Sequence, residues 1–245
     1  YNSMFGVNEF AEEATFRLQA KLEFAGDQKL DFRTMRTAVT NSPAPTPLLV
    51  AGSLASRVQK VFTNARETPN MERVEAVIDL LPERRAATIE QVWLERRRLR
   101  PGETLRGKVI VQPYRGSPLE RDFDLAIPAG APKGRLTLMV SEAAVLNQRR
   151  ERAAQRSRAM SVPETVSLLN QELSNDQIYI ALLNRTPTAH LDGNALPNVP
   201  LTALNVMRPA AQGRLALELQ SPVAETSLAM DAVVSGTQSV SVTLE

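Results

Sequence analysis

Residues 104–112 read TLRGKVIVQ and residues 119–127 read LERDFDLAI, and in both segments apolar and polar side chains alternate. A period of two is typical of a strand with one buried face, because successive side chains of a strand point to opposite sides. Turn-forming residues separate the two segments at Arg115-Gly116, and a loop rich in Pro and Gly follows at residues 128–134. Short strands at this spacing predict that the stretch from Val74 to Val140 is a small immunoglobulin-like β-sandwich.

Both flanks of this stretch combine strands with helices. Residues 14–24 alternate most regularly, and the turn at Gly26-Asp27 leads into a return strand, which predicts a hairpin. Apolar residues then recur every three or four positions over residues 48–62, as in an amphipathic helix. Ser161, followed by Glu164, predicts a capping box at the start of a second helix. Further strands are expected at residues 178–182, 215–219 and 240–244, and a short helix at residues 201–207.

We therefore expect a mainly β fold with helices, an α+β chain in three parts. Residues 1–69 would form a hairpin-plus-helix segment, and residues 70–146 the immunoglobulin-like sandwich. Residues 147–245 would form a basic linker and a second α+β segment, which could pack with the first part. Trp93 alternates in phase with Ile89, so we expect it to be the large core residue of the sandwich.

The composition excludes several classes of function. The chain has no cysteine, which removes disulfides, thiol catalysis and thiolate metal sites. Aromatic residues make up 4% of the chain, too few for a platform that stacks bases or sugars, and a net charge of +2 argues against nucleic acid as a partner. No stretch approaches the roughly 20 apolar residues of a transmembrane helix. Because the chain starts at Tyr1 rather than Met, we expect it to be a piece of a longer protein.

The residues that could carry hydrolytic chemistry are few. His190 is the only histidine, and Asp192 follows it in a loop, so a hydrolase using both with an unidentified serine is one alternative. A surface histidine in a loop is the simpler interpretation. Ser117 lies in Gly116-Ser117-Pro118, a sequence that also surrounds some serine nucleophiles, but its place between two strands is typical of a turn.

No cofactor or metal site is expected. Asp122 and Asp124 share one face of a strand and could bind calcium with a loop carbonyl, although alternation also explains them as a solvated face. A catalytic zinc centre usually needs two or three histidines, which this chain cannot supply.

Arginine is concentrated in two clusters. A polyanion- or glycan-binding module built from them is a second alternative, and solvated charge that blocks edge-to-edge strand pairing is the other interpretation. The clusters comprise Arg96, Arg97, Arg98 and Arg100, and Arg149, Arg150, Arg152, Arg156 and Arg158.

Several turn and strand signatures resemble those of a known family. They are Leu80-Leu81-Pro82-Glu83-Arg84-Arg85, Ile89-Glu90-Gln91-Val92-Trp93, Leu99-Arg100-Pro101-Gly102-Glu103-Thr104, Gln112-Pro113-Tyr114-Arg115-Gly116 and Ile127-Pro128-Ala129-Gly130, with residues 175–179, 196–200 and 234–236 later in the chain. Together they resemble the C-terminal portion of large exported bacterial proteins whose front half is a SpoIVB-type serine peptidase domain. The resemblance implies an extracytoplasmic protein whose nucleophile, histidine and carboxylate lie upstream of Tyr1. It assigns no catalytic residue within this chain.

The sequence thus predicts a non-catalytic accessory region. It would support an attached peptidase domain or bind a protein or cell-envelope partner, and strand edges are the natural docking surfaces for such a partner. Neither a cofactor nor a metal is part of this expectation.

Overall fold

The computed structural model describes residues 13–38, 45–63, 67–154, 161–184, 188–191, 194–196, 215–218 and 221–245. The expected mainly β fold with helices is confirmed. The chain divides into two compact units, each built from separate segments. Unit 1 comprises Tyr1–Ala87, Ala159–Asp176 and Met230–Val233, and unit 2 comprises Thr88–Arg158, Gln177–Ala229 and Val234–Glu245. Within the described residues, no helix has the length and apolar content needed to cross a bilayer.

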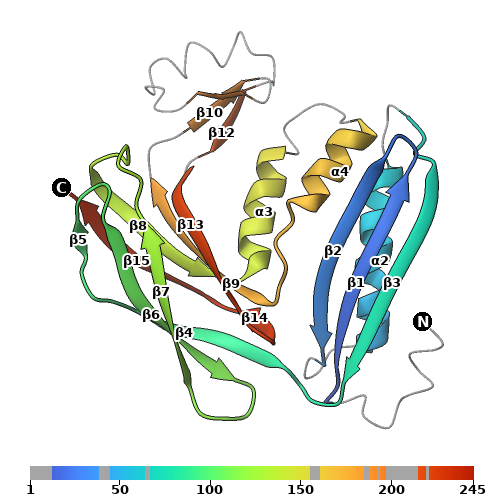
Figure 1. Cartoon of the computed structure of the whole chain (residues 1–245), viewed down its shortest axis with the longest axis horizontal. Coiled ribbons are helices and arrows are strands. Elements are labelled where there is room, and N and C mark those ends of the chain that lie inside the picture. Colours follow the sequence, from blue (N-terminus) through green and yellow to red (C-terminus); the bar gives the residue numbers. More distant parts are fainter. Residues whose placement is uncertain are drawn as a thin grey trace. The chain divides into compact units, whose positions relative to one another are not determined.

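Unit 1 contains a three-stranded antiparallel sheet in the order β2-β1-β3 (Figure 1). Its strands are β1 (Thr15–Phe24), β2 (Gln28–Thr37) and β3 (Met71–Leu81). The predicted hairpin is confirmed, because β1 pairs with β2 along its whole length. Gly26 and Asp27 turn the chain with φ of 78° and 58°, a left-handed conformation that Gly and Asp adopt more readily than most residues.

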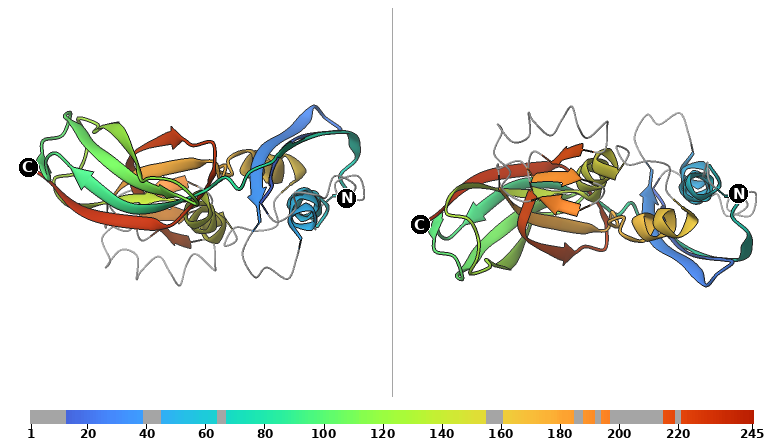
Figure 2. Two further views of the ribbon diagram at one scale, coloured as in Figure 1. Left: turned by 90° about the horizontal axis from the view of Figure 1, so that it is seen from below. Right: turned by 90° about the horizontal axis from the view of Figure 1, so that it is seen from above.

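Two helices cover one face of this sheet. They are α2 (Thr46–Phe62) and α4 (Val162–Asn170), and Figure 2 shows α2 nearly end-on beside the strands. The predicted helix at residues 48–62 and the predicted capping box of Ser161 and Glu164 are both confirmed. Alternate residues of β1 form the core beneath the helices together with apolar residues of β2, α2 and α4, among them Phe16, Leu18, Leu22, Phe24, Leu30, Val50, Val61, Val162, Val166 and Leu169.

The exposed glycine of α2 leads to a simple prediction. Gly52 lies in the helix interior with no positive φ, and a Cβ added there would meet no atom within 4 Å. Because glycine costs a helix interior about 0.5–1 kcal/mol relative to alanine, Gly52→Ala should raise the free energy of unfolding by that amount. Urea unfolding followed by circular dichroism would measure the change, and a lower stability would contradict the prediction.

Unit 2 contains two larger sheets. One has the strand order β14-β4-β6-β7 and the other the order β13-β9-β8-β15-β5. Their strands are β4 (Ala86–Leu94), β5 (Arg98–Leu99), β6 (Thr104–Pro113), β7 (Leu119–Ala126), β8 (Gly134–Ser141), β9 (Gln177–Asn184), β13 (Ser221–Ala229), β14 (Val233–Ser235) and β15 (Thr237–Leu244). A smaller sheet has the order β11-β10-β12, with β10 at Thr188–Leu191, β11 at Asn194–Leu196 and β12 at Leu215–Glu218.

Alternating residues of the two larger sheets form the core of unit 2. Leu105, Val109 and Val111 of β6 are fully buried, as the sequence pattern predicts. Their counterparts in the five-stranded sheet are Leu136, Leu138, Val140, Ile178, Ile180, Leu182, Val242 and Leu244. Strand β9 is buried along both faces, and helix α3 (Ala143–Ala154) contributes Ala143 and Leu146 to the buried set.

The structure divides the chain differently from the boundaries expected at residues 69/70 and 146/147. Strand β3 (Met71–Leu81) is expected within the sandwich. It instead pairs with β1 of unit 1, from Thr15 to Phe24. Strands β9 and β15 come from the C-terminal third, yet both pair directly with β8. Of that third, only residues 159–176 and 230–233 belong to unit 1. The short helix expected at residues 201–207 lies outside the described residues.

The prediction that Trp93 is a core residue is wrong, because its side chain is 59% exposed. Ile89 is buried, but the alternation does not continue, and Leu94 instead approaches the core position of Gly107. Since Gly107 has no side chain, the Leu94 side chain and the Trp93 carbonyl occupy the space beside it. Trp93 is therefore turned outward.

Candidate interaction surface

The two edges of the sheet in unit 1 differ in how their backbone groups are satisfied. Beside β2, the Asn170 amide accepts a hydrogen bond from the Asp31 N–H at 2.9 Å and donates one to the Lys29 carbonyl at 2.8 Å. The Ser174 hydroxyl donates to the Arg33 carbonyl at 3.3 Å. Side chains from the end of α4 and the segment after it thus stand in for a neighbouring strand.

Asn175 completes this cover. Its side-chain oxygen accepts from the Met35 N–H at 2.8 Å, and its amide nitrogen donates to the Met35 carbonyl at 2.8 Å. The same oxygen accepts from the Thr34 hydroxyl at 3.3 Å. An exposed strand edge invites pairing with another chain, and proteins block such edges by covering them. The β2 edge is blocked in this way.

The opposite edge, β3, has no strand beside it among the described residues. All side chains from Glu72 to Asp79 are exposed, on both faces of the sheet. Val77 is 58% exposed, Val74 44% and Ile78 39%, although the β1 residues paired with Val74 and Ile78 are fully buried. The helices therefore cover β1, and Met71 and Leu80 near the ends of β3 pack against the same core, but the middle of β3 from Glu72 to Asp79 is left bare as a partly apolar, open edge.

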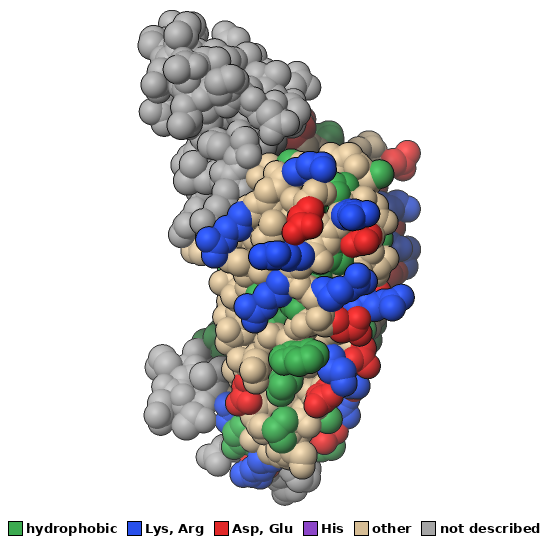
Figure 3. All heavy atoms as spheres, turned by 90° about the vertical axis from the view of Figure 1, so that its left-hand side faces the viewer, with side chains coloured by type: hydrophobic (Ala, Val, Ile, Leu, Met, Phe, Trp, Pro, Cys, Tyr) green, Lys and Arg blue, Asp and Glu red, His purple; other side chains and the backbone are tan. Residues whose placement is uncertain are grey.

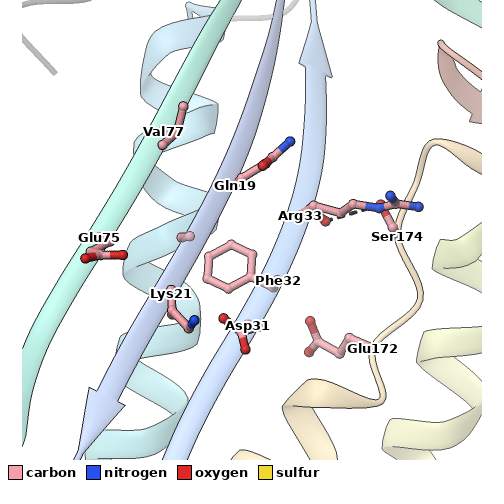
Figure 4. Close-up of a pocket in the computed structure, with 10 residues that line it drawn as sticks. Gln19, Lys21, Asp31, Phe32, Arg33, Glu75, Val77, Glu172 and Ser174 are labelled. Carbon is pink, nitrogen blue, oxygen red and sulfur yellow. Dashed lines mark hydrogen bonds between the residues drawn. The ribbon is translucent and has the colours of Figure 1, made fainter.

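A shallow hollow of about 530 Å³ spans the sheet, from Glu75 and Val77 of β3 to Glu172 and Ser174 beside β2 (Figure 4). The strand register puts Gln19, Arg33 and Val77 in one row across it, and Lys21 between Asp31 and Glu75 in the next row. This row places one cation between two carboxylates, so the hollow carries a net negative charge at this point. Such a surface suits a peptide with mixed side chains better than a small anion.

A cluster of charged side chains links α2 to the segment that follows α4. Glu172 bridges Arg57 at 2.8 Å and Lys60 at 3.1 Å, so α2 is tied to the segment after α4. The Arg57 guanidinium also lies over the Phe32 ring, 4.3 Å from its centroid. Burial lowers the pKa of Arg36 below its ordinary value, and nearby Arg57 lowers this pKa further. These contacts stabilise the β2 side of the unit rather than forming a reactive group.

Of the residues considered for hydrolysis, only Ser117 has a described side chain. The backbone of His190 lies in β10, but its side chain lies outside the described part of the chain, as does Asp192. Ser117 is exposed and follows Gly116, which has a φ of 138°. The Gly116 carbonyl accepts a hydrogen bond from the Gln112 side-chain amide at 2.9 Å, and both features are typical of a turn. The turn interpretation is confirmed for Ser117.

Asp122 and Asp124 lie on the solvated face of β7. Asp124 pairs with Arg106 at 3.5 Å, and Lys108 lies 3.9 Å from Asp122. The hydrogen bond from Lys108 to Glu120, and the charges of Glu120 and Asp122, raise the pKa of Lys108 above its usual range. In the described ranges, no group of three or more acidic, His or Cys residues could hold a metal ion.

The first arginine cluster lies on the surface around β5. Arg98 in β5 and its neighbours Arg96, Arg97 and Arg100 are all exposed, and Arg98 lies 4.0 Å from Glu245. Arg149 is exposed on α3, whereas the side chains of Arg150 and Arg152 are outside the described part, together with Arg156 and Arg158. Figure 3 shows Lys and Arg side chains on one face of the molecule with Asp and Glu side chains among them.

Comparison of the chain with protein-family models, with curated proteins and with solved structures finds no match. The resemblance to proteins with a SpoIVB-type peptidase domain therefore stays a prediction.

Sequence reasoning missed the β3 edge. Residues 71–81 read MERVEAVIDLL, in which Val74, Ala76, Ile78 and Leu80 alternate as in a half-buried strand, while Val77 adds an apolar residue to the opposite face. Apolar residues on both faces of a strand, mixed with charges, are the available signal, and they fit an edge that its own chain leaves open.

Proposed function

We propose that this chain is a non-catalytic interaction region that binds a protein partner by accepting a strand at the edge of β3. The observation that carries this proposal is the contrast between the two sheet edges. The β2 edge is covered by Asn170, Ser174 and Asn175, whereas every side chain from Glu72 to Asp79 is exposed. Strand addition provides affinity through main-chain hydrogen bonds and specificity through alternate side chains.

The register identifies which backbone groups would bind. The odd residues Lys29, Asp31, Arg33 and Met35 of β2 direct their backbone groups away from β1. Since bonding sides alternate along antiparallel strands, even residues of β1 bond to β2, and odd residues bond to β3. The even residues of β3, centred on Ala76, therefore direct their N–H and C=O groups to the open edge.

The substitution Ala76→Pro tests this proposal. It removes one N–H at the centre of the open edge, in a strand position where proline is tolerated because that N–H has no partner in the sheet. Short peptides selected from a displayed random library on the folded chain should bind the wild type and lose at least about tenfold in affinity for Ala76→Pro.

Ala76→Val is the matched control, because it keeps the N–H and favours a strand. It should retain binding, and both variants should show the far-ultraviolet circular dichroism of the wild type. Selected peptides that bind Ala76→Pro as tightly as the wild type would rule out the β3 edge as the docking site.

The wider setting forms part of the same proposal. We propose that the interaction region belongs to an exported bacterial protein with a SpoIVB-type peptidase domain, which the turn and strand signatures support. We also propose an immunoglobulin-like arrangement for unit 2, supported by its two sheets with alternating buried residues. An upstream reading frame that lacks a peptidase domain would remove the first of these two points.

A further inference from the structure

We infer that β3 pairs antiparallel with β3 of a second copy of this chain, with Ala76 opposite Ala76. The inference rests on the proposed function, because it names the partner of the same strand edge. Two three-stranded sheets would then join into one continuous sheet across a two-fold axis, and a two-fold axis requires a self-complementary strand.

The sequence of β3 is self-complementary in this register. Each Arg73 lies opposite an Asp79 of the other copy, so two pairs of opposite charge form on one face. All eleven residues of the strand find a partner, from Met71 opposite Leu81 to the central alanines. Even residues, which carry the open backbone groups, also face even residues, so the main-chain hydrogen bonds can form.

Neighbouring registers are less favourable. A two-fold axis at Glu75 would place the two Glu75 carboxylates directly opposite each other, and an axis at Val77 would place Glu75 opposite Asp79 twice. Like charges opposite each other destabilise a sheet. An axis at Val74 pairs Arg73 with Glu75, but it leaves the C-terminal end of β3 unpaired.

Pairing at Ala76 also covers apolar surface that the helices of unit 1 leave bare. Val74 and Ile78 lie on the same face as the buried Leu22 and Leu18 of β1, yet they are 44% and 39% exposed. In the Ala76 register each Val74 lies opposite an Ile78 of the other copy. The pairing thus gives these side chains a neighbour of matching chemistry, which contributes to association through burial.

Charge reversal provides a test that does not depend on a single variant. Sedimentation velocity of the full chain over a range of concentrations should show the wild type associating to twice its 26.9 kDa mass. In a dimer of Arg73→Asp, the four carboxylates at positions 73 and 79 form two opposing pairs. In a dimer of Asp79→Arg, four guanidinium groups oppose each other at the same positions. Each variant alone should dimerise roughly 30-fold more weakly than the wild type.

The two variants mixed in equal amounts should recover the dimer. In the mixed dimer, both carboxylates of the Arg73→Asp chain lie opposite the two guanidinium groups of the Asp79→Arg chain, so each opposing pair again joins unlike charges. Recovery in the mixture would also show that both variants fold.

Three results would overturn the inference. They are a wild type that stays monomeric at all concentrations, single variants that dimerise as well as the wild type, and a mixture that stays monomeric. If peptides selected on the chain still require the Ala76 N–H, a monomeric wild type leaves strand addition from another protein intact.

Discussion

Replacing Gly107 with valine is expected to lower the free energy of unfolding by about 3 kcal/mol, because overfilling a packed core forces its neighbours apart. Gly107 is buried on β6 between Leu105 and Val109. A Cβ at this position would contact the Trp93 carbonyl oxygen far inside van der Waals distance. It would also lie 2.8 Å from Phe123 Cζ and 2.9 Å from Leu94 Cδ2. The carbonyl belongs to the backbone of β4, so it cannot move away as a flexible side chain could.

Urea unfolding of wild type and Gly107→Val, monitored by circular dichroism, would measure this difference. Gly130→Ala is the matched control, because a Cβ there meets no atom within 4 Å and its φ is not positive. The control should change the free energy of unfolding by less than about 0.5 kcal/mol. Equal stability of Gly107→Val and the wild type would show that β4 and β6 do not approach each other as described.

The second large effect is expected at Leu22, whose side chain is 0% exposed beneath the helices of unit 1. Truncating a fully buried leucine to alanine removes its apolar contacts and leaves a cavity, which costs between about 2 and 5 kcal/mol. Leu22→Ala should therefore lower the free energy of unfolding by about 3 kcal/mol in the same urea titration.

Val74→Ala is the comparison that makes this measurement informative. Val74 lies directly opposite Leu22 in the sheet register and on the same face, but it is 44% exposed. Its truncation should cost less than about 1 kcal/mol in a dilute, monomeric sample. Similar losses for both variants would mean that the helices cover β3 as well as β1, and would remove the basis for an open edge.

Local patterns in the sequence predict most of the secondary structure correctly. The hairpin around Gly26-Asp27, the helix at residues 48–62 and the capping box of Ser161 with Glu164 depend on interactions between near neighbours. Turn chemistry, helical periodicity and capping are all visible in such short segments.

The pairing of strands that lie far apart in the sequence could not be predicted in the same way. Strand β8 pairs with β9 and β15, and no local pattern specifies which distant strand becomes a neighbour. Trp93 shows a related failure, because it is the next residue, Leu94, whose side chain lies beside Gly107 on the adjacent strand. A period of two along β4 contains no information about that neighbour.

The candidate site was equally hard to find from sequence. A strand edge is open when no other part of the chain bonds to it. The difference between the open β3 edge and the covered β2 edge becomes visible only once Asn170 and Asn175 are found to bond to β2. Asparagine near a helix end usually indicates a cap or a turn. Its role here, in replacing a strand, becomes visible only in the folded chain.

The division of unit 1 into three segments has a consequence for biosynthesis. Asp231 pairs with Arg17 and Arg85, and the Val233 N–H donates to the Arg85 carbonyl at 2.9 Å. The ribosome must therefore translate past Asp231 before Arg17 of the first hairpin can acquire its ion pair. Before Asn170 and Asn175 are translated, the nascent chain also carries β2 with an unprotected edge, and holdase chaperones would have their longest opportunity to engage the polypeptide during this interval.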